Sequence, residues 1–203
     1  TYVTLHQLMR YDEAVAVQKW WESVNPTSCA TPLNKGWAWM LKGDYAEAIA
    51  NFRQALALCP TQPKTQYRIN QALVLLERPA EALEEVERES NPNYRLYTLA
   101  IAHNALGNQA QSAQALEELK QRYVENSTLS GLIASAHAFR GEPDEAFDWL
   151  AGMDEEAVAE YEIRWDLPGF VPLRDDPRWM AVVDQYWFTP DELAAIEFEV
   201  TLP

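Results

Sequence analysis

Small residues recur along this chain at a fixed spacing. Residues 43–48, Gly-Asp-Tyr-Ala-Glu-Ala, return in altered form at 77–82 and, after a gap, at 141–146. Ala14 precedes Ala48 by the same thirty-four residues. A repeat of that length is one supersecondary unit that buries its apolar face only against its neighbours. The pattern therefore predicts a solenoid, whose function resides in an extended surface.

Helix-start signals fall at matching places in this register. Asp44 and Asn108 are suitable N-caps, each with a Glu or Gln three residues later. Pro79 and Pro143 suit a first helical turn, where the missing amide hydrogen costs nothing. Proline also marks helix ends, because the residue before it is disfavoured in helical geometry. These end signals are Asn25-Pro26, Cys59-Pro60 and Asn91-Pro92.

Residues 33–60 resemble a tetratricopeptide repeat, in which small residues sit where the two helices cross and large ones face the next hairpin. The residues that carry the resemblance are Gly36, Trp39, Gly43, Tyr45, Ala48, Phe52, Ala55 and Pro60. The resemblance implies an all-α, right-handed superhelix of antiparallel helix pairs with a C-terminal helical cap. Five units follow at 1–28 (incomplete), 29–62, 63–92, 93–126 and 127–155, with capping helices and a tail over 156–203.

The C-terminal region has a pattern of its own. Residues 165–179 resemble the terminal cap of tetratricopeptide arrays in bacterial multidomain regulators, such as cyclases, protein kinases and winged-helix activators. A helix over 155–163, another from Pro177 capped by Asp175 or Asp176, and a short one from Pro190 through Ile196 are expected. The tail, 197–203, alternates polar and apolar residues, a pattern that favours an extended chain with one apolar side. It is expected to dock on its own chain or to form a homodimer, with a loose tail as the alternative.

Charge and composition limit the partners. The 203 residues are 48% hydrophobic, contain no apolar run long enough for a membrane span, and carry a formal net charge of -15. Residues 127–203 hold four basic and seventeen acidic side chains. Such a field repels phosphate backbones, which argues against nucleic acid and favours a basic protein partner; a merely solvated acidic face is the alternative. The start at Thr1, without a leader, suggests an excised C-terminal piece of a longer protein.

Signals for catalysis are weak throughout. The chain has no phosphate-binding glycine loop, nucleophile elbow or metal-spaced cysteine pair. His103 and His137 occupy equivalent places in successive repeats, about 10 Å apart, which is too far to share a metal. The acidic runs 154–156 and 175–176 lie in polar turns, where no carboxyl is desolvated for acid catalysis. We therefore expect a non-enzymatic protein without cofactor or metal.

Cys29 and Cys59 should lie near each other, since one opens and the other closes an antiparallel hairpin. Two free thiols in a reducing compartment are the first interpretation, and a disulfide in an oxidising one is the second. The cytoplasm is the expected location, with the periplasm as the alternative if a membrane anchor lies upstream.

The resemblance places the first helix of each hairpin on the concave face. A floor of aromatic, aliphatic and amide side chains suits an extended peptide or a partner helix. The alternative interpretation is that several of these side chains form core between repeats. The candidates are Leu33, Trp37, Met40, Tyr67, Gln71, Val74, Tyr97, Ile101, Asn104, Ser135 and Phe139. A protein-binding module is thus the first hypothesis. A structural or oligomerisation segment with a self-filled groove and a small-molecule sensor are the alternatives.

Overall fold

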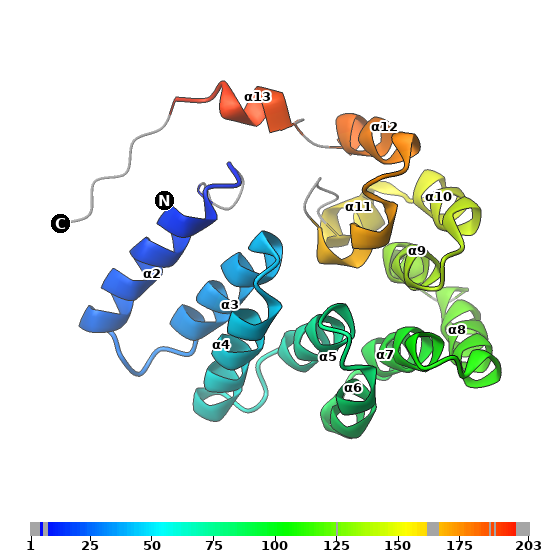
Figure 1. The fold of residues 1–203 in the computed structure, drawn as a ribbon, viewed down its shortest axis with the longest axis horizontal. Coiled ribbons are helices and arrows are strands. Elements are labelled where there is room, and N and C mark those ends of the chain that lie inside the picture. The colour runs from blue at the N-terminus through cyan, green and yellow to red at the C-terminus, as the bar shows by residue number, and fades with distance from the viewer. Residues whose placement is uncertain are drawn as a thin grey trace.

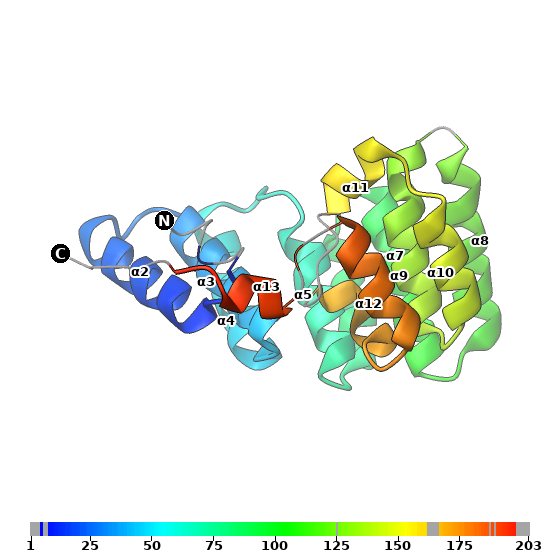
Figure 2. The same ribbon diagram turned by 90° about the horizontal axis from the view of Figure 1, so that it is seen from above.

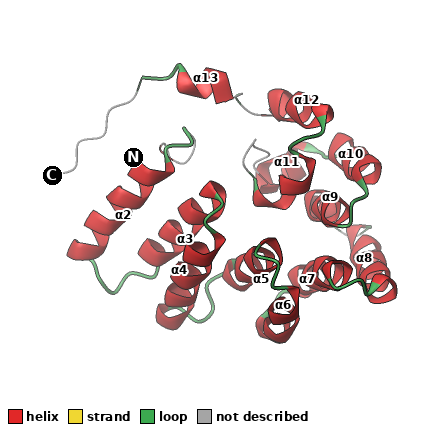
Figure 3. Cartoon of the chain, in the orientation of Figure 1, coloured by secondary structure: helices red, strands yellow, loops and turns green. Residues whose placement is uncertain are grey.

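The protein is an arc of helical hairpins, as its computed structural model shows (Figure 1). The structure describes residue 5 and residues 8–124, 126–161, 167–186, 188 and 190–197. Regular secondary structure within these ranges is entirely helical (Figure 3). The predicted all-α repeat architecture is therefore confirmed.

Four consecutive hairpins form the body of the arc. Their helices are α3 (Ala30–Lys42) with α4 (Tyr45–Leu58), α5 (Thr65–Leu75) with α6 (Pro79–Glu85), α7 (Pro92–Ala105) with α8 (Gln109–Tyr123), and α9 (Ser130–Phe139) with α10 (Pro143–Ala151). Helix α2 (Tyr11–Val24) precedes them and packs on α3. In Figure 1, α5, α7 and α9 lie on the inner side of the arc, while α6, α8 and α10 lie outside.

The remaining elements are short. Two single-turn 3-10 helices are present: η1 (Val86–Arg88) follows α6, and η2 (Ser127–Leu129) precedes α9. The C-terminal part contains α11 (Glu155–Tyr161), the 3-10 segment η3 (Pro168–Leu173), α12 (Pro177–Tyr186) and α13 (Pro190–Ala194). Figure 2 shows α12 and α13 leading from the last hairpins back toward the first.

One turn joins the two helices of every hairpin. In the first, the backbone N–H of Asp44 donates to the carbonyl of Trp39 at 2.9 Å, and the same bond, spanning five residues, recurs in the other three. Gly43, at the C-cap of α3, has a φ of +92°, a left-handed geometry that glycine adopts without strain. The repeated glycines are therefore explained by the turn.

The predicted helix starts are largely confirmed. Pro79 and Pro143 begin α6 and α10, and Asp176 caps α12 by accepting from the backbone N–H of Arg178 at 2.9 Å. Asp44 and Asn108 precede α4 and α8 as expected, but neither side chain accepts a capping bond. Helix α13 ends at Ala194, two residues before the predicted end. Trp165, Thr189 and residues 198–203 of the tail lie outside the described residues.

The core is built from small side chains at crossings and large ones between hairpins. At the α3–α4 crossing, a Cβ on Gly36 would lie 2.6 Å from the ring of Phe52, so only glycine fits there. A continuous cluster of buried side chains runs from Met40 through Tyr97 to Ile133. A second cluster joins α9 and α10 to the C-terminal segment through Phe170 and Trp179.

The two cysteines are bonded. Cys29 precedes α3 and Cys59 follows α4, with their Cα atoms 5.9 Å apart and their sulfurs joined. The spatial proximity expected from the hairpin is confirmed, whereas the interpretation as free thiols is wrong for this structure. The bond links the open ends of the hairpin that most closely resembles the repeat.

Candidate protein-binding face

A chain of hydrogen bonds crosses the inner helices. Gln71 Nε2 donates to the hydroxyl of Tyr97 at 2.8 Å, and Tyr97 Oη lies 2.8 Å from Ser135 Oγ. Ser135 Oγ in turn donates to the carbonyl of Gly169 at 2.9 Å. Since that bond uses the serine hydrogen, Tyr97 is the donor to Ser135. These hydrogen bonds thus connect α5, α7 and α9 with the C-terminal segment.

Burial keeps this chain of bonds uncharged. Tyr97 is fully buried, and loss of solvation raises the pKa of its phenol well above the ordinary value. The neighbouring phenol of Tyr67 raises that pKa further, while the bonds to Ser135 and Gln71 lower it. Tyr97 therefore remains a neutral hydroxyl that both accepts and donates, as its position requires.

Aromatic rings line the same inner helices. Tyr67 stacks on Tyr94 with ring centroids 4.6 Å apart and meets Tyr97 edge-on at 5.4 Å. Tyr97 meets Phe139 edge-on at 6.5 Å. The guanidinium of Arg68 on α5 lies 4.3 Å from the ring centroid of Trp37 on α3. Such pairs each add stability beyond their buried area, so the rings hold neighbouring hairpins in register.

The chain's own C-terminal segment lies against the inner helices at one end. A Cβ on Gly169 would be 2.7 Å from Ser135 Oγ and 3.6 Å from Gln71 Nε2, so the backbone of η3 approaches α5 and α9 closely. Phe170 beside it is fully buried. Trp37 of α3 also packs against the cluster that contains Phe170 and Trp179. The cap expected at the open end of the array therefore reaches across the concave side to the second unit.

The eleven sequence-predicted residues divide into two groups. Six are buried within the chain itself: Met40, Gln71, Val74, Tyr97, Ile101 and Ser135. They pack between adjacent hairpins or beneath η3, so they present no surface to a partner in this conformation. The other five keep part of their surface: Leu33, Trp37, Tyr67, Asn104 and Phe139. An inner helix buries one part of its face against its neighbours and exposes another, and sequence position alone does not separate the two.

Gly169, Phe170 and Arg68 are not among the residues that the sequence predicts for this face. The signal for the segment was present: Leu167-Pro168-Gly169-Phe170 is apolar, yet proline and glycine prevent a regular helix. An apolar stretch without helical periodicity has to be buried by docking on another element. Arg68 had no comparable signal, since a lone basic residue on a helix is ordinary.

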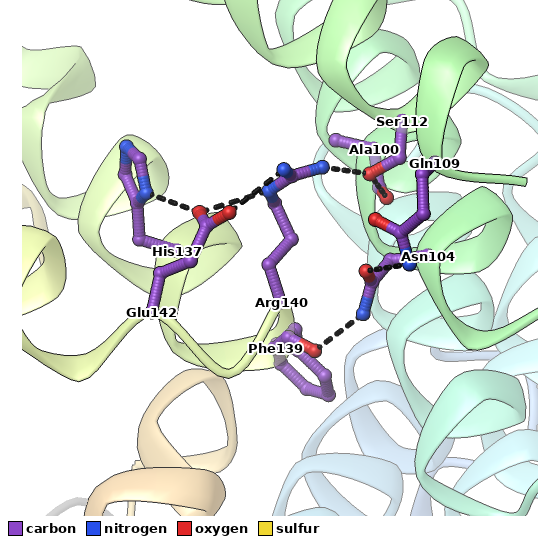
Figure 4. A network of polar contacts seen from close by, with 8 residues as sticks. All are labelled: Ala100, Asn104, Gln109, Ser112, His137, Phe139, Arg140 and Glu142. Atoms are coloured by element: carbon purple, nitrogen blue, oxygen red, sulfur yellow. Dashed lines mark hydrogen bonds and ion pairs between the residues drawn. The ribbon is translucent and has the colours of Figure 1, made fainter. Parts of the chain in front are cut away.

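A polar network joins the last two hairpins (Figure 4). Arg140 donates to both carboxylate oxygens of Glu142, at 2.9 and 2.7 Å, and also to Ser112 Oγ. His137 Nδ1 lies 2.7 Å from Glu142, while its Nε2 is buried and has no partner among the described residues. Ser112 Oγ donates to the carbonyl of Ala100 at 2.7 Å.

The charges of this network depend on burial and pairing. The bond from Arg140 holds the pKa of Glu142 below its ordinary value, and burial holds the pKa of His137 below its own. Neutral His137 therefore donates through Nδ1 to an ionised Glu142. Ser112 bonds Arg140 and not His137, so the three do not form a nucleophilic triad.

Neither a metal centre nor a spanning helix is found in the part of the chain that the structure describes. No group of three or more His, Cys, Asp or Glu side chains there could hold a metal ion. No described helix is long and apolar enough to cross a membrane.

The comparisons agree with the fold. The tetratricopeptide repeat family model matches residues 33–62, which cover most of α3 and all of α4. No curated protein matches the chain significantly. Tetratricopeptide repeats generally mediate protein–protein interactions and are generally not enzymes. The chain is therefore an all-α helical repeat, one hairpin of which is similar to the tetratricopeptide repeat.

Proposed function

We propose that this chain is a non-enzymatic protein-binding module that holds an extended segment of a partner on its concave side. The observation that carries the proposal is η3, because an apolar segment of the chain itself already lies there. The carbonyl of Gly169 accepts a hydrogen bond from Ser135, and Phe170 is buried beside it. η3 is a 3-10 turn, but it shows that this face accepts a main-chain carbonyl and a buried aromatic side chain, two kinds of contact that an extended peptide also offers.

The surface for an external partner lies toward α3 and α5. Leu33, Trp37 and Tyr67 keep part of their surface, and Arg68 and Tyr94 hold the last two rings in place. Rigid aromatic side chains give buried area at low entropic cost. The net charge of -15 argues against nucleic acid as the partner. A place at the C-terminal end of a larger bacterial regulator is part of the proposal, and it rests on the resemblance of residues 165–179.

A peptide library displayed on phage and selected on the purified chain tests the proposal. Selected peptides should bind the Tyr67→Ala variant about thirtyfold more weakly, since hot-spot truncation commonly costs about 2 kcal/mol. Leu58→Ala is the matched control, because Leu58 lies exposed on α4. Circular dichroism of both variants verifies the fold. Equal binding by the wild type and Tyr67→Ala would place the site elsewhere.

A self-filled groove with a structural or oligomerising role is the second candidate. The close approach of Gly169 to Ser135 and Gln71 favours it, because the occupied half of the concave side offers no room for another chain. This candidate predicts that no peptide from the library binds the concave face. A homodimer seen by light scattering would support its oligomerising form.

A further inference from the structure

Two aromatic rings form the walls of an open hollow at one end of the last two hairpins. Tyr123 ends α8 and Trp149 lies in the last turn of α10, with ring centroids 4.9 Å apart and planes at 89°. The hollow has a volume of about 260 Å³ and is lined by Tyr123, Asp148, Trp149 and Gly152. Both rings are half-buried against the core. The walls are therefore fixed before any ligand arrives.

The chemistry of the lining favours a cation. The faces of Trp and Tyr attract cations through their electron-rich π systems. Asp148 adds an exposed carboxylate, and the hollow lies at the C-terminal end of α10, where the helix dipole is negative. Lys120 and Arg122, the basic residues in the last turn of α8, oppose this field in part. The rings, the carboxylate and the helix end all attract the same sign of charge.

Elsewhere the chain covers similar rings with its own arginines. Arg68 lies over Trp37 at 4.3 Å, and Arg178 lies over Phe147 at 4.2 Å. Among the residues that the structure describes, no lysine or arginine covers Tyr123 or Trp149. The neighbouring Val124 is 85% exposed, which extends the apolar surface beyond the hollow. Among the described residues, Tyr123 and Trp149 thus have no cation over them of the kind that Trp37 and Phe147 have.

We propose that this hollow is a second interaction site, which binds an arginine side chain of a partner protein. A planar guanidinium can stack on one ring and direct two N–H groups at Asp148, which a lysine ammonium cannot do. Each water molecule in the liquid occupies about 30 Å³. A hollow of about 260 Å³ therefore has room for a guanidinium group. The site lies on α8 and α10, away from η3, and does not depend on the concave face.

The test uses the full chain and two small probes, N-acetylarginine methylamide and its neutral isostere N-acetylcitrulline methylamide. Nuclear magnetic resonance follows the indole N–H signal of Trp149, which is identified as the one lost in Trp149→Phe. The arginine probe should shift this signal and bind about fivefold more tightly than the citrulline probe. Asp148→Asn should weaken arginine binding about threefold, whereas Glu145→Gln, on the same helix, should leave it unchanged.

The outcomes separate clearly. Equal shifts with both probes, or shifts that bypass the Trp149 indole, would overturn the proposal. So would arginine binding that Asp148→Asn leaves unaltered, since this substitution lies at the surface and should not disturb folding. A lysine probe that binds as well as arginine would contradict the stacking geometry. Phage selection on the concave face can fail without affecting any of these results.

Discussion

A single backbone position shows how the repeat tolerates deviation. Gly43, Gly107 and Gly141 close their hairpin turns with positive φ, and Glu77 takes the same place with a φ of 58°. Left-handed geometry costs a residue with a side chain roughly 1–2 kcal/mol. Glycine recovers that energy but loses part of it through its greater freedom in the unfolded chain.

Glu77→Gly should therefore stabilise the protein by about 0.5–1 kcal/mol. Urea unfolding followed by circular dichroism measures the change in the free energy of unfolding. The converse substitution, Gly107→Ala, is the matched control and should lower stability by about 1 kcal/mol, because nothing else crowds that position. A destabilised Glu77→Gly variant would mean that the glutamate side chain contributes more than its backbone costs.

His137 makes stability depend on pH. Burial lowers its folded-state pKa, so below the ordinary value of 6.5 the unfolded chain binds a proton more readily than the folded chain. The free energy of unfolding should fall as the pH decreases through this range. Glu142, whose pKa is lowered by Arg140, adds a further loss below its ordinary value of 4.5. Glu89 has the opposite effect, because burial raises its pKa.

The His137→Gln variant isolates the imidazole. Glutamine can still donate to Glu142 but does not titrate, so the loss of stability just below pH 6.5 should become shallower. Thermal unfolding between pH 5 and 8 provides the comparison with wild type. His103→Gln serves as control, because His103 occupies the equivalent turn and is only partly buried. An unchanged slope in His137→Gln would assign the pH dependence to other groups.

At the scale of the element, the sequence predicts the helical hairpins but not the disulfide that links the two ends of one of them. Helix starts at Pro79 and Pro143 follow from local rules that act within a few residues. The bond between Cys29 and Cys59 depends on the redox compartment, about which a sequence of helices says nothing. The same limit applies to Tyr97, which is linked through Ser135 to Gly169, a residue far along the chain.

The disulfide should be the strongest single support of the α3–α4 hairpin. It closes a loop with a sequence separation of 30 residues, for which loss of unfolded-state freedom predicts about 3.6 kcal/mol. Cys29→Ser combined with Cys59→Ser should lower stability by that amount. Dithiothreitol should do the same to the wild type and nothing further to the double variant. A wild type that is equally stable under reducing and oxidising conditions would contradict this expectation.

For the molecule as a whole, the return of the C-terminal segment changes how the array behaves. When each repeat contacts only its neighbours, the free energy of unfolding of the array is a sum of contributions from single repeats and adjacent pairs. The two ends of such an array can therefore unfold separately. Here Trp37 of α3 packs against the cluster of Phe170 and Trp179, so the second unit contacts the cap of the last. Sequence periodicity reports contacts between adjacent repeats, which explains why the cap was predicted and its reach across the concave side was not.

Phe170→Ala should therefore loosen both ends of the array. Removing a buried phenylalanine ring costs about 3–5 kcal/mol, and the loss should reach α3 through Trp37 as well as α9. Hydrogen exchange resolved by mass spectrometry should show faster exchange in peptides from both helices. Leu58→Ala, at an exposed position on α4, should alter neither. Faster exchange confined to α9 and α10 would show that the segment stabilises only the hairpins beside it, and that the arc opens from its ends like a simple solenoid.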